Sequence, residues 1–184
     1  MASFAASSFS DVSSLPSSAA VPPPTRLRLP DLLYATDRYA DGVLEGRFDH
    51  LLPAGGLPAE SRWHTRLHTD GELDVWLISW VAGHATELHD HCGSLGALTV
   101  LSGALDEYRW DGERLRRRRL DAGDQAGFPL GWVHDVAAAR TTSQETLSVH
   151  AYSPPLTAMS YYEVTPRQTV RRIRTELTEA PEAS

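Results

Sequence analysis

The chain has 184 residues and a formal net charge of −7 at pH 7. This length suits one domain with a substantial apolar core, and the acidic balance gives no indication of nucleic-acid binding. A single cysteine excludes an internal disulfide framework, and the apolar runs are too short to span a membrane.

The first 28 residues are rich in Ser, Ala and Pro and include the run Val21-Pro22-Pro23-Pro24. Such a segment buries too little apolar surface to order itself, so residues 1–28 are predicted to be a disordered leader. It lacks the basic start and continuous apolar centre of a secretory signal, and we expect a cytoplasmic protein. The folded domain is predicted to span residues 29–175, with one or two short helices before residue 55.

From residue 62 onward, short alternating segments separated by turns predict a mainly β structure, either a sandwich or a barrel. The expected strands are Leu73 to Ala82, Gly96 to Leu101, Ala104 to Trp110, Arg114 to Leu120, Gln125 to Phe128, Val133 to Ala139, Glu145 to Tyr152 and Met159 to Val164. The arginine run in the fourth of these is interpreted as a solvated edge that discourages strand pairing, with a partner site as the alternative. Residues 176–184 form an acidic tail that is expected to fray.

Two glycine-framed segments contain three histidines. The first places His89, Asp90 and His91 between Gly83 and Gly103, and the second places His134 after a Pro129-Leu130-Gly131 turn. On a strand, residues i and i+2 face the same side, so His89 and His91 are predicted to share a metal with His134. A hairpin with a surface His-x-His is the alternative. None of the other histidines, His50, His64, His68 and His84, is assigned to the metal.

A third polar pattern lies on the strand expected over residues 145–152. Alternation places Ser148, His150 and Tyr152 on one face. A hydroxyl, an imidazole and a phenol in a row can pass hydrogen bonds from one to the next. The alternative is a half-buried strand whose polar side chains face solvent. The tryptophans Trp76, Trp80 and Trp132 are expected in the core or in a pocket wall.

The two histidine segments resemble the double motif of the cupin superfamily. With the string Ser148-Val149-His150-Ala151-Tyr152-Ser153-Pro154-Pro155, residues 60 to 165 resemble the cysteine dioxygenase type I family. The resemblance implies a cupin jelly-roll β-barrel with the metal inside it. It also implies Fe(II) held by His89, His91 and His134, with Ser148, His150 and Tyr152 as catalytic residues outside the metal ligands. A Tyr-x-Arg segment of the family binds the substrate carboxylate, and its nearest match is His64-Thr65-Arg66. Arg66 is therefore the candidate, with Arg62 as the alternative.

The chain departs from these family patterns at several positions. Gly96 stands where many cupins have a metal-binding Glu and where the animal enzymes have a Cys linked to the active-site Tyr. Ala138 replaces an Asn of the second cupin motif, and the Tyr of Tyr-x-Arg is His64. The only cysteine, Cys92, follows His91 and is expected to point away from the metal. We therefore predict a site with three neutral ligands and no Cys–Tyr crosslink.

These observations predict a non-haem Fe(II) thiol dioxygenase that oxidises L-cysteine with O2 to its sulfinic acid. The alternatives are a dioxygenase for another thiol, such as 3-mercaptopropionate or a longer aminothiol, and a metal-binding cupin sensor without turnover. A zinc hydrolase is a third possibility, because three histidines with an open position also suit Zn²⁺. The expected partners are a small thiol and O2, without nucleic acid or membrane, in a monomer or weak homo-oligomer.

Overall fold

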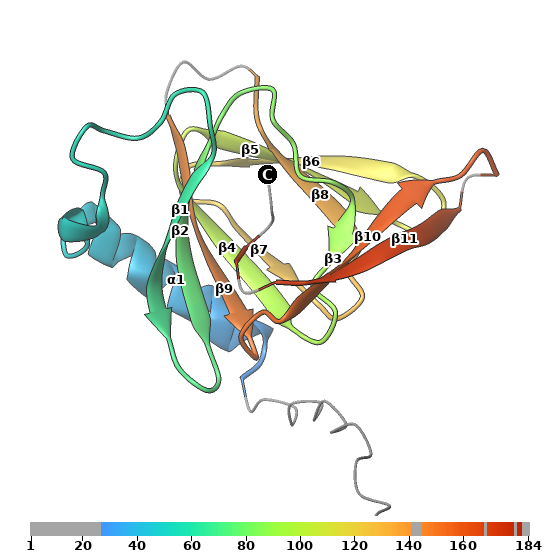
Figure 1. The fold of residues 1–184 in the computed structure, drawn as a ribbon, viewed down its shortest axis with the longest axis horizontal. Coiled ribbons are helices and arrows are strands. Elements are labelled where there is room, and N and C mark those ends of the chain that lie inside the picture. The colour runs from blue at the N-terminus through green and yellow to red at the C-terminus, as the bar shows by residue number, and fades with distance from the viewer. Residues whose placement is uncertain (1–26, 141–144, 168, 179, 182–184) are drawn as a thin grey trace, which may run out of the picture.

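The protein is described here by a computed structural model covering residues 27–140, 145–167, 169–178 and 180–181. Residues 1–26 of the predicted leader thus lie outside the described part. Two antiparallel sheets face each other, and one helix covers the outer side of the five-stranded sheet (Figure 1). In spatial order the first sheet contains β1 (Trp63–Thr69), β2 (Asp74–Trp80), β9 (Thr146–Ser153), β4 (Leu95–Ser102) and β7 (Gln125–Phe128). The second contains β11 (Val170–Leu177), β10 (Ala158–Val164), β3 (His89–Asp90), β8 (His134–Ala138), β5 (Ala104–Trp110) and β6 (Leu115–Asp121). The predicted mainly β jelly roll is confirmed.

Helix α1 (Leu29–Leu44) begins where Pro30 suits the first turn and where the Asp31 carboxylate accepts a hydrogen bond from the Arg28 backbone N–H at 2.8 Å. Its buried face includes Leu32, Thr36 and Ala40. The Thr99 hydroxyl of β4 donates to the Thr36 hydroxyl at 2.9 Å. One long helix and a short 3₁₀ turn, η1 (Asp49–Leu51), therefore take the place of the one or two short helices that the sequence predicted.

The core has two layers because the central strands of the five-stranded sheet, β2, β9 and β4, are buried on both faces. One layer lies between the two sheets, and its large members include Trp80, Leu98, Phe128 and Tyr152. The other lies between the five-stranded sheet and α1. Strand β9 contributes alternate side chains to each, as the period of two in a strand requires. The inner layer is the one that surrounds the candidate site.

The predicted strands agree with the observed ones to within a residue or two, with three omissions. Strand β1 has only a weak apolar alternation. Strand β11 is a mostly exposed edge strand, and its sequence does not alternate between apolar and polar residues. Strand β3 has two residues, so His91 lies just beyond it rather than on a longer strand. Strand β11 continues through Leu177, two residues into the expected tail; the domain boundaries otherwise remain predictions.

The arginine run occupies β6, which is an edge of the six-stranded sheet. This agrees with the interpretation of the run as a charged edge. The arginines alternate between the two sides of the sheet, and the two sides differ in their ion pairs. On the outer side, Arg117 contacts Asp106 at 2.9 Å and Arg119 contacts Asp121 at 2.8 Å.

Candidate metal centre and the hydrogen-bonded chain beside it

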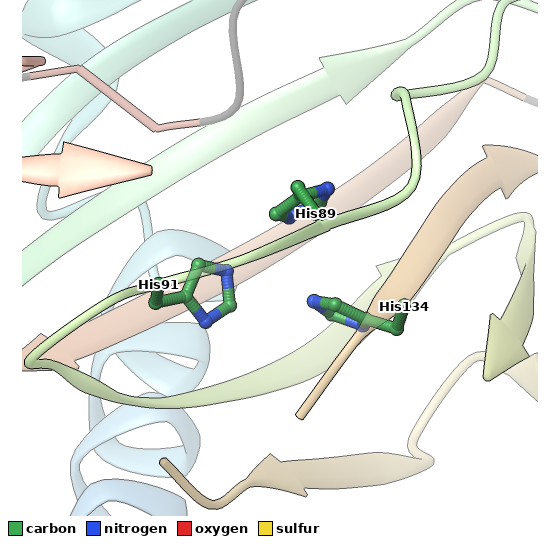
Figure 2. A group of neighbouring side chains, drawn as sticks. All are labelled: His89, His91 and His134. Carbon is green, nitrogen blue, oxygen red and sulfur yellow. The ribbon is translucent and has the colours of Figure 1, made fainter. Parts of the chain in front are cut away.

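The structure brings His89, His91 and His134 together inside the barrel (Figure 2). His89 of β3 pairs in register with His134 of β8, and His91 follows β3 directly. One nitrogen from each ring lies within 4.8 Å of the others, and the side chains are at most 4% exposed. Such a buried group of imidazoles is a set of donors suited to a divalent transition metal. Among the described residues, this group includes no carboxylate.

Oxygen atoms beside Nδ1 orient two of the three imidazoles. His89 donates from Nδ1 to the backbone carbonyl of Glu87 at 2.7 Å, which keeps the lone pair on Nε2. His134 Nδ1 lies 3.5 Å from Oε1 of the buried Glu107, which also accepts a hydrogen bond from Trp132 Nε1 at 2.9 Å. A carbonyl or carboxylate beside Nδ1 favours the tautomer whose Nε2 can bind a metal.

The buried carboxyl of Glu107 remains charged in this setting. Burial raises its pKa, but the contacts with His134 and Trp132 and the nearby charge of Arg118 together lower it by more, so the net pKa lies below the usual range. A negative charge behind His134 makes that imidazole a stronger donor toward a cation. The pattern of the sequence did not reveal Glu107, because its contact with His134 depends on the pairing of β5 with β8.

Gly96 lies where any side chain would touch the histidine cluster. A Cβ at this position would meet His91 Nδ1 and Phe128 Cδ2, each at 3.0 Å. The Gly96 backbone pairs with Tyr152 of β9. The glycine therefore allows His91 to pack closely against β4, in the space that a side chain at position 96 would need.

The predicted row of polar residues on β9 is a continuous chain of buried side chains. Ser148 Oγ lies 2.9 Å from His150 Nε2, and Tyr152 Oη lies 3.4 Å from His150 Nδ1. The chain has one more member than predicted, because Trp80 Nε1 donates to Ser148 Oγ at 2.7 Å. The Tyr152 ring centroid lies 5.0 Å from that of His91. The chain therefore begins at a tryptophan on β2 and ends beside the histidine cluster.

The comparisons with known proteins agree with this arrangement. The sequence profile of the family described as cysteine dioxygenase type I matches residues 57–165, which contain all three histidines and the Ser-x-His-x-Tyr segment.

The chain belongs to the cysteine dioxygenase type I family.

Several solved structures are also similar. An uncharacterized conserved protein with a double-stranded β-helix domain from Klebsiella pneumoniae is 19% identical, with 57% of this chain and 83% of that chain covered and a TM-score of 0.49. KdgF from Halomonas sp. is 19% identical, with 52% and 82% covered and a TM-score of 0.45. A cupin superfamily protein from Desulfitobacterium hafniense is 12% identical, with 53% and 81% covered and a TM-score of 0.45. In the described residues, no helix has the length and apolar character needed to cross a membrane.

Within this cysteine dioxygenase family member, Arg66 lies in the middle of β1, and Arg62 immediately precedes that strand. Arg66 pairs in register with Trp76, stacks over its ring at 4.4 Å, and has Nε 3.7 Å from the buried Asp74 carboxylate. Asp74 pairs in register with Tyr152. Arg62 stacks over Trp80 at 3.8 Å, at the other end of the hydrogen-bonded chain. The register of β1, β2 and β9 therefore places Arg66 nearer than Arg62 to Tyr152.

Cys92 lies on the side of β3 opposite to the histidine cluster. Its Sγ is 3.3 Å from Ser160 Oγ of β10, and Ser160 pairs in register with Asp90. Its backbone has φ of +50° and donates to the Asp90 carboxylate at 2.9 Å. The thiol has the orientation that the sequence predicted.

The remaining histidines and tryptophans occupy roles that the sequence left open. His64 packs edge-on against Trp76, and His68 contacts Asp70 at 3.0 Å. Among the described residues, the three-histidine group includes none of His50, His64, His68 and His84. Trp132 packs partly buried against the inner core, and its indole N–H binds Glu107. Sequence reasoning missed Glu107 altogether, and it placed Trp80 in the core or a pocket wall without its hydrogen bond to Ser148.

Proposed function

We propose that this protein is an Fe(II)-dependent thiol dioxygenase that converts a small thiol, first of all L-cysteine, into its sulfinic acid. The observation that carries the proposal is the meeting of two sets of residues. The three buried histidines lie beside the end of the hydrogen-bonded chain formed by Trp80, Ser148, His150 and Tyr152. A binding module has no evident need for such a chain.

His89, His91 and His134 would hold the metal, and the family points to iron. The residues fit that group, because three buried imidazoles, two of them with an oxygen beside Nδ1, offer neutral nitrogen donors. When bound, Fe(II) in a three-histidine site supplies open positions for a thiolate and for O2. Overall, RSH and O2 give RSO₂H, so both oxygen atoms are transferred to sulfur and no other reductant is required.

The direction of the hydrogen-bonded chain assigns a task to Tyr152. The indole N–H of Trp80 can only donate, so Ser148 Oγ accepts there, and we assign the hydrogen of Ser148 to its contact with His150 Nε2. His150 then carries its hydrogen on Nδ1, which faces Tyr152 Oη. The phenol oxygen thus has a donor behind it, and its own hydrogen can be donated toward the substrate beside His91. We infer that the Tyr152 hydroxyl orients the reactants and holds a proton that it can donate during the reaction.

Arg66 is the residue that we propose to bind the carboxylate of the substrate. Its guanidinium lies over Trp76 and beside Asp74, on the inner face and at the Tyr152 end of the sheet. A guanidinium held in place by an aromatic ring and an acidic partner is a suitable donor for a carboxylate. This assignment favours L-cysteine or 3-mercaptopropionate over cysteamine, which has no carboxylate.

The test is oxygen uptake by the iron-loaded protein with L-cysteine, 3-mercaptopropionate and cysteamine supplied separately, with the product identified by mass. Uptake with L-cysteine and a product heavier by two oxygen atoms is the expected result. Uptake with only another thiol would retain the dioxygenase and replace the substrate. A His134→Ala variant, analysed for bound iron, is the matched control and should lose both metal and uptake. An iron-loaded protein that consumes no O2 with any thiol would overturn the proposal in favour of a sensor.

A further inference from the structure

A cleft lies on the inner side of the six-stranded sheet, beside the Glu107 carboxylate that faces His134. It has a volume of about 290 Å³ and is lined by Arg109 of β5, by Arg116 and Arg118 of β6, and by Glu107 and Trp132. Register shows that these side chains share a face with His134. Arg109 pairs with both His134 and Arg116, and Glu107 pairs with Arg118. The cleft therefore brings three guanidinium groups to one side of Glu107.

The inner arginines differ from the outer arginines of the same strand in how their charge is compensated. On the outer side, Arg117 and Arg119 each have an aspartate partner. On the inner side, Arg116 contacts Asp111, whereas Arg118 donates to the backbone carbonyl of Gln125 at 3.2 Å.

Arg109 completes this inner group. Its guanidinium lies 4.5 Å from the centre of the Trp132 ring, and within the described residues no carboxylate lies within ion-pair distance of it. The carboxylate of Glu107 contacts Trp132 and His134 and also interacts electrostatically with Arg118, so the three arginines of the cleft share two carboxylates, those of Glu107 and Asp111. The cleft therefore has more positive than negative charge.

We propose that this cleft binds a small oxyanion through Arg109 and Arg118. Guanidinium groups bind the oxygens of carboxylates, phosphates, sulfonates and sulfinates with two hydrogen bonds each, and the Trp132 ring holds the Arg109 guanidinium in place. The volume of the cleft suits a molecule of a few heavy atoms rather than a folded partner.

The cleft also has a physical connection to the candidate metal centre. Trp132 contributes its ring to Arg109 and its N–H to Glu107, and the same Glu107 oxygen faces His134 Nδ1. An anion that draws Arg109 or Arg118 toward itself would change the surroundings of Trp132 and Glu107. The indole N–H of Trp132 is therefore the natural reporter of binding.

The experiment is a titration of the full-length, chelator-treated protein, followed through the ¹⁵N-labelled indole resonance of Trp132 and assigned with Trp132→Phe. Inorganic phosphate, methanesulfonate and acetate are added separately at constant ionic strength to distinguish the sources of the oxyanion. We expect a saturable shift. Arg109→Gln and Arg118→Gln should each raise the dissociation constant about tenfold, the loss of one charge-assisted hydrogen bond. Arg117→Gln, on the opposite face of β6, is the matched control and should leave the constant unchanged.

Each other outcome overturns the proposal. No saturable shift with any of the three anions would exclude the site. An equal loss in Arg117→Gln would indicate diffuse surface charge. Polyglutamate is titrated in the same way, and its binding without binding of the small anions would assign the cleft to a macromolecular partner. The measurement needs neither bound metal nor turnover, so its failure is distinct from failure of the dioxygenase proposal.

Discussion

The two faces of strand β9 are both largely buried but have different compositions. Leu147, Val149 and Ala151 pack toward α1, and the alternate residues Ser148, His150 and Tyr152 face the barrel interior. The outer set makes only apolar contacts. The inner set makes hydrogen bonds that begin at Trp80. One strand thus holds apolar groups that support the fold and polar groups proposed to take part in the chemistry, one residue apart, and substitutions on either face should have separable effects.

The largest effect on turnover is expected from the inner face at its metal end. Replacing Tyr152 by Phe keeps the buried ring and removes the hydroxyl, so kcat should fall about a hundredfold while bound iron stays unchanged. Steady-state oxygen uptake and metal analysis provide the two readings. Tyr161→Phe, at a buried tyrosine whose hydroxyl faces Met159 Sδ, is the matched control and should change kcat little. Loss of iron together with activity would show instead that Tyr152 supports the fold of the site.

A smaller effect, on KM and only for thiols that carry a carboxylate, is expected from substitution of Arg66. Arg66→Gln should raise KM for L-cysteine about tenfold through the loss of a charge-assisted hydrogen bond to the carboxylate. The value for cysteamine, which has no carboxylate, should not change. Arg62→Gln, immediately before the same strand, serves as the control. A rise in KM for L-cysteine in the Arg62 variant alone would transfer the role to that residue.

A still smaller effect is expected at the far end of the hydrogen-bonded chain. Trp80→Phe leaves the buried Ser148 hydroxyl without its donor, which should lower the free energy of unfolding by about 1–3 kcal/mol. It should also reduce kcat severalfold, because the chain then lacks its fixed direction. Urea unfolding and kinetics of Trp80→Phe, Ser148→Ala and the double variant form a cycle. Simple additivity of the two effects on kcat would contradict the chain.

The smallest effect on activity is expected from the outer face. Val149→Ala removes two buried methyl groups from the layer beneath α1 and should lower the free energy of unfolding by about 2 kcal/mol. Its kcat and KM should match those of the wild-type protein at a temperature where both are folded. A clear loss of kcat in this variant would mean that the two faces of β9 are not separable.

The sequence predicted those parts of the structure that depend on local patterns. The bounds of β5 and β7 agree with the predicted strands because turns with glycine frame a regular alternation. The three histidines were found because their spacing is local to two short motifs. The structure brings them together as those motifs indicated.

The remaining features depend on pairings between distant segments. Trp80 meets Ser148 from 68 positions away, and Trp132 meets Glu107 from 25 positions away. No periodicity within one strand reveals which residue lies opposite on another. Strand β1 was missed for a related reason, since its inner face bears His64 and Arg66 instead of apolar side chains.

The position of Cys92 offers a spectroscopic use. It is the only cysteine in the sequence, it is partly exposed, and it follows His91 while its thiol turns toward Ser160. A nitroxide or fluorophore attached to this single thiol would lie within a short distance of the three imidazoles. Paramagnetic relaxation or quenching of that label would then record the arrival and departure of a metal ion in real time, without any assay of turnover.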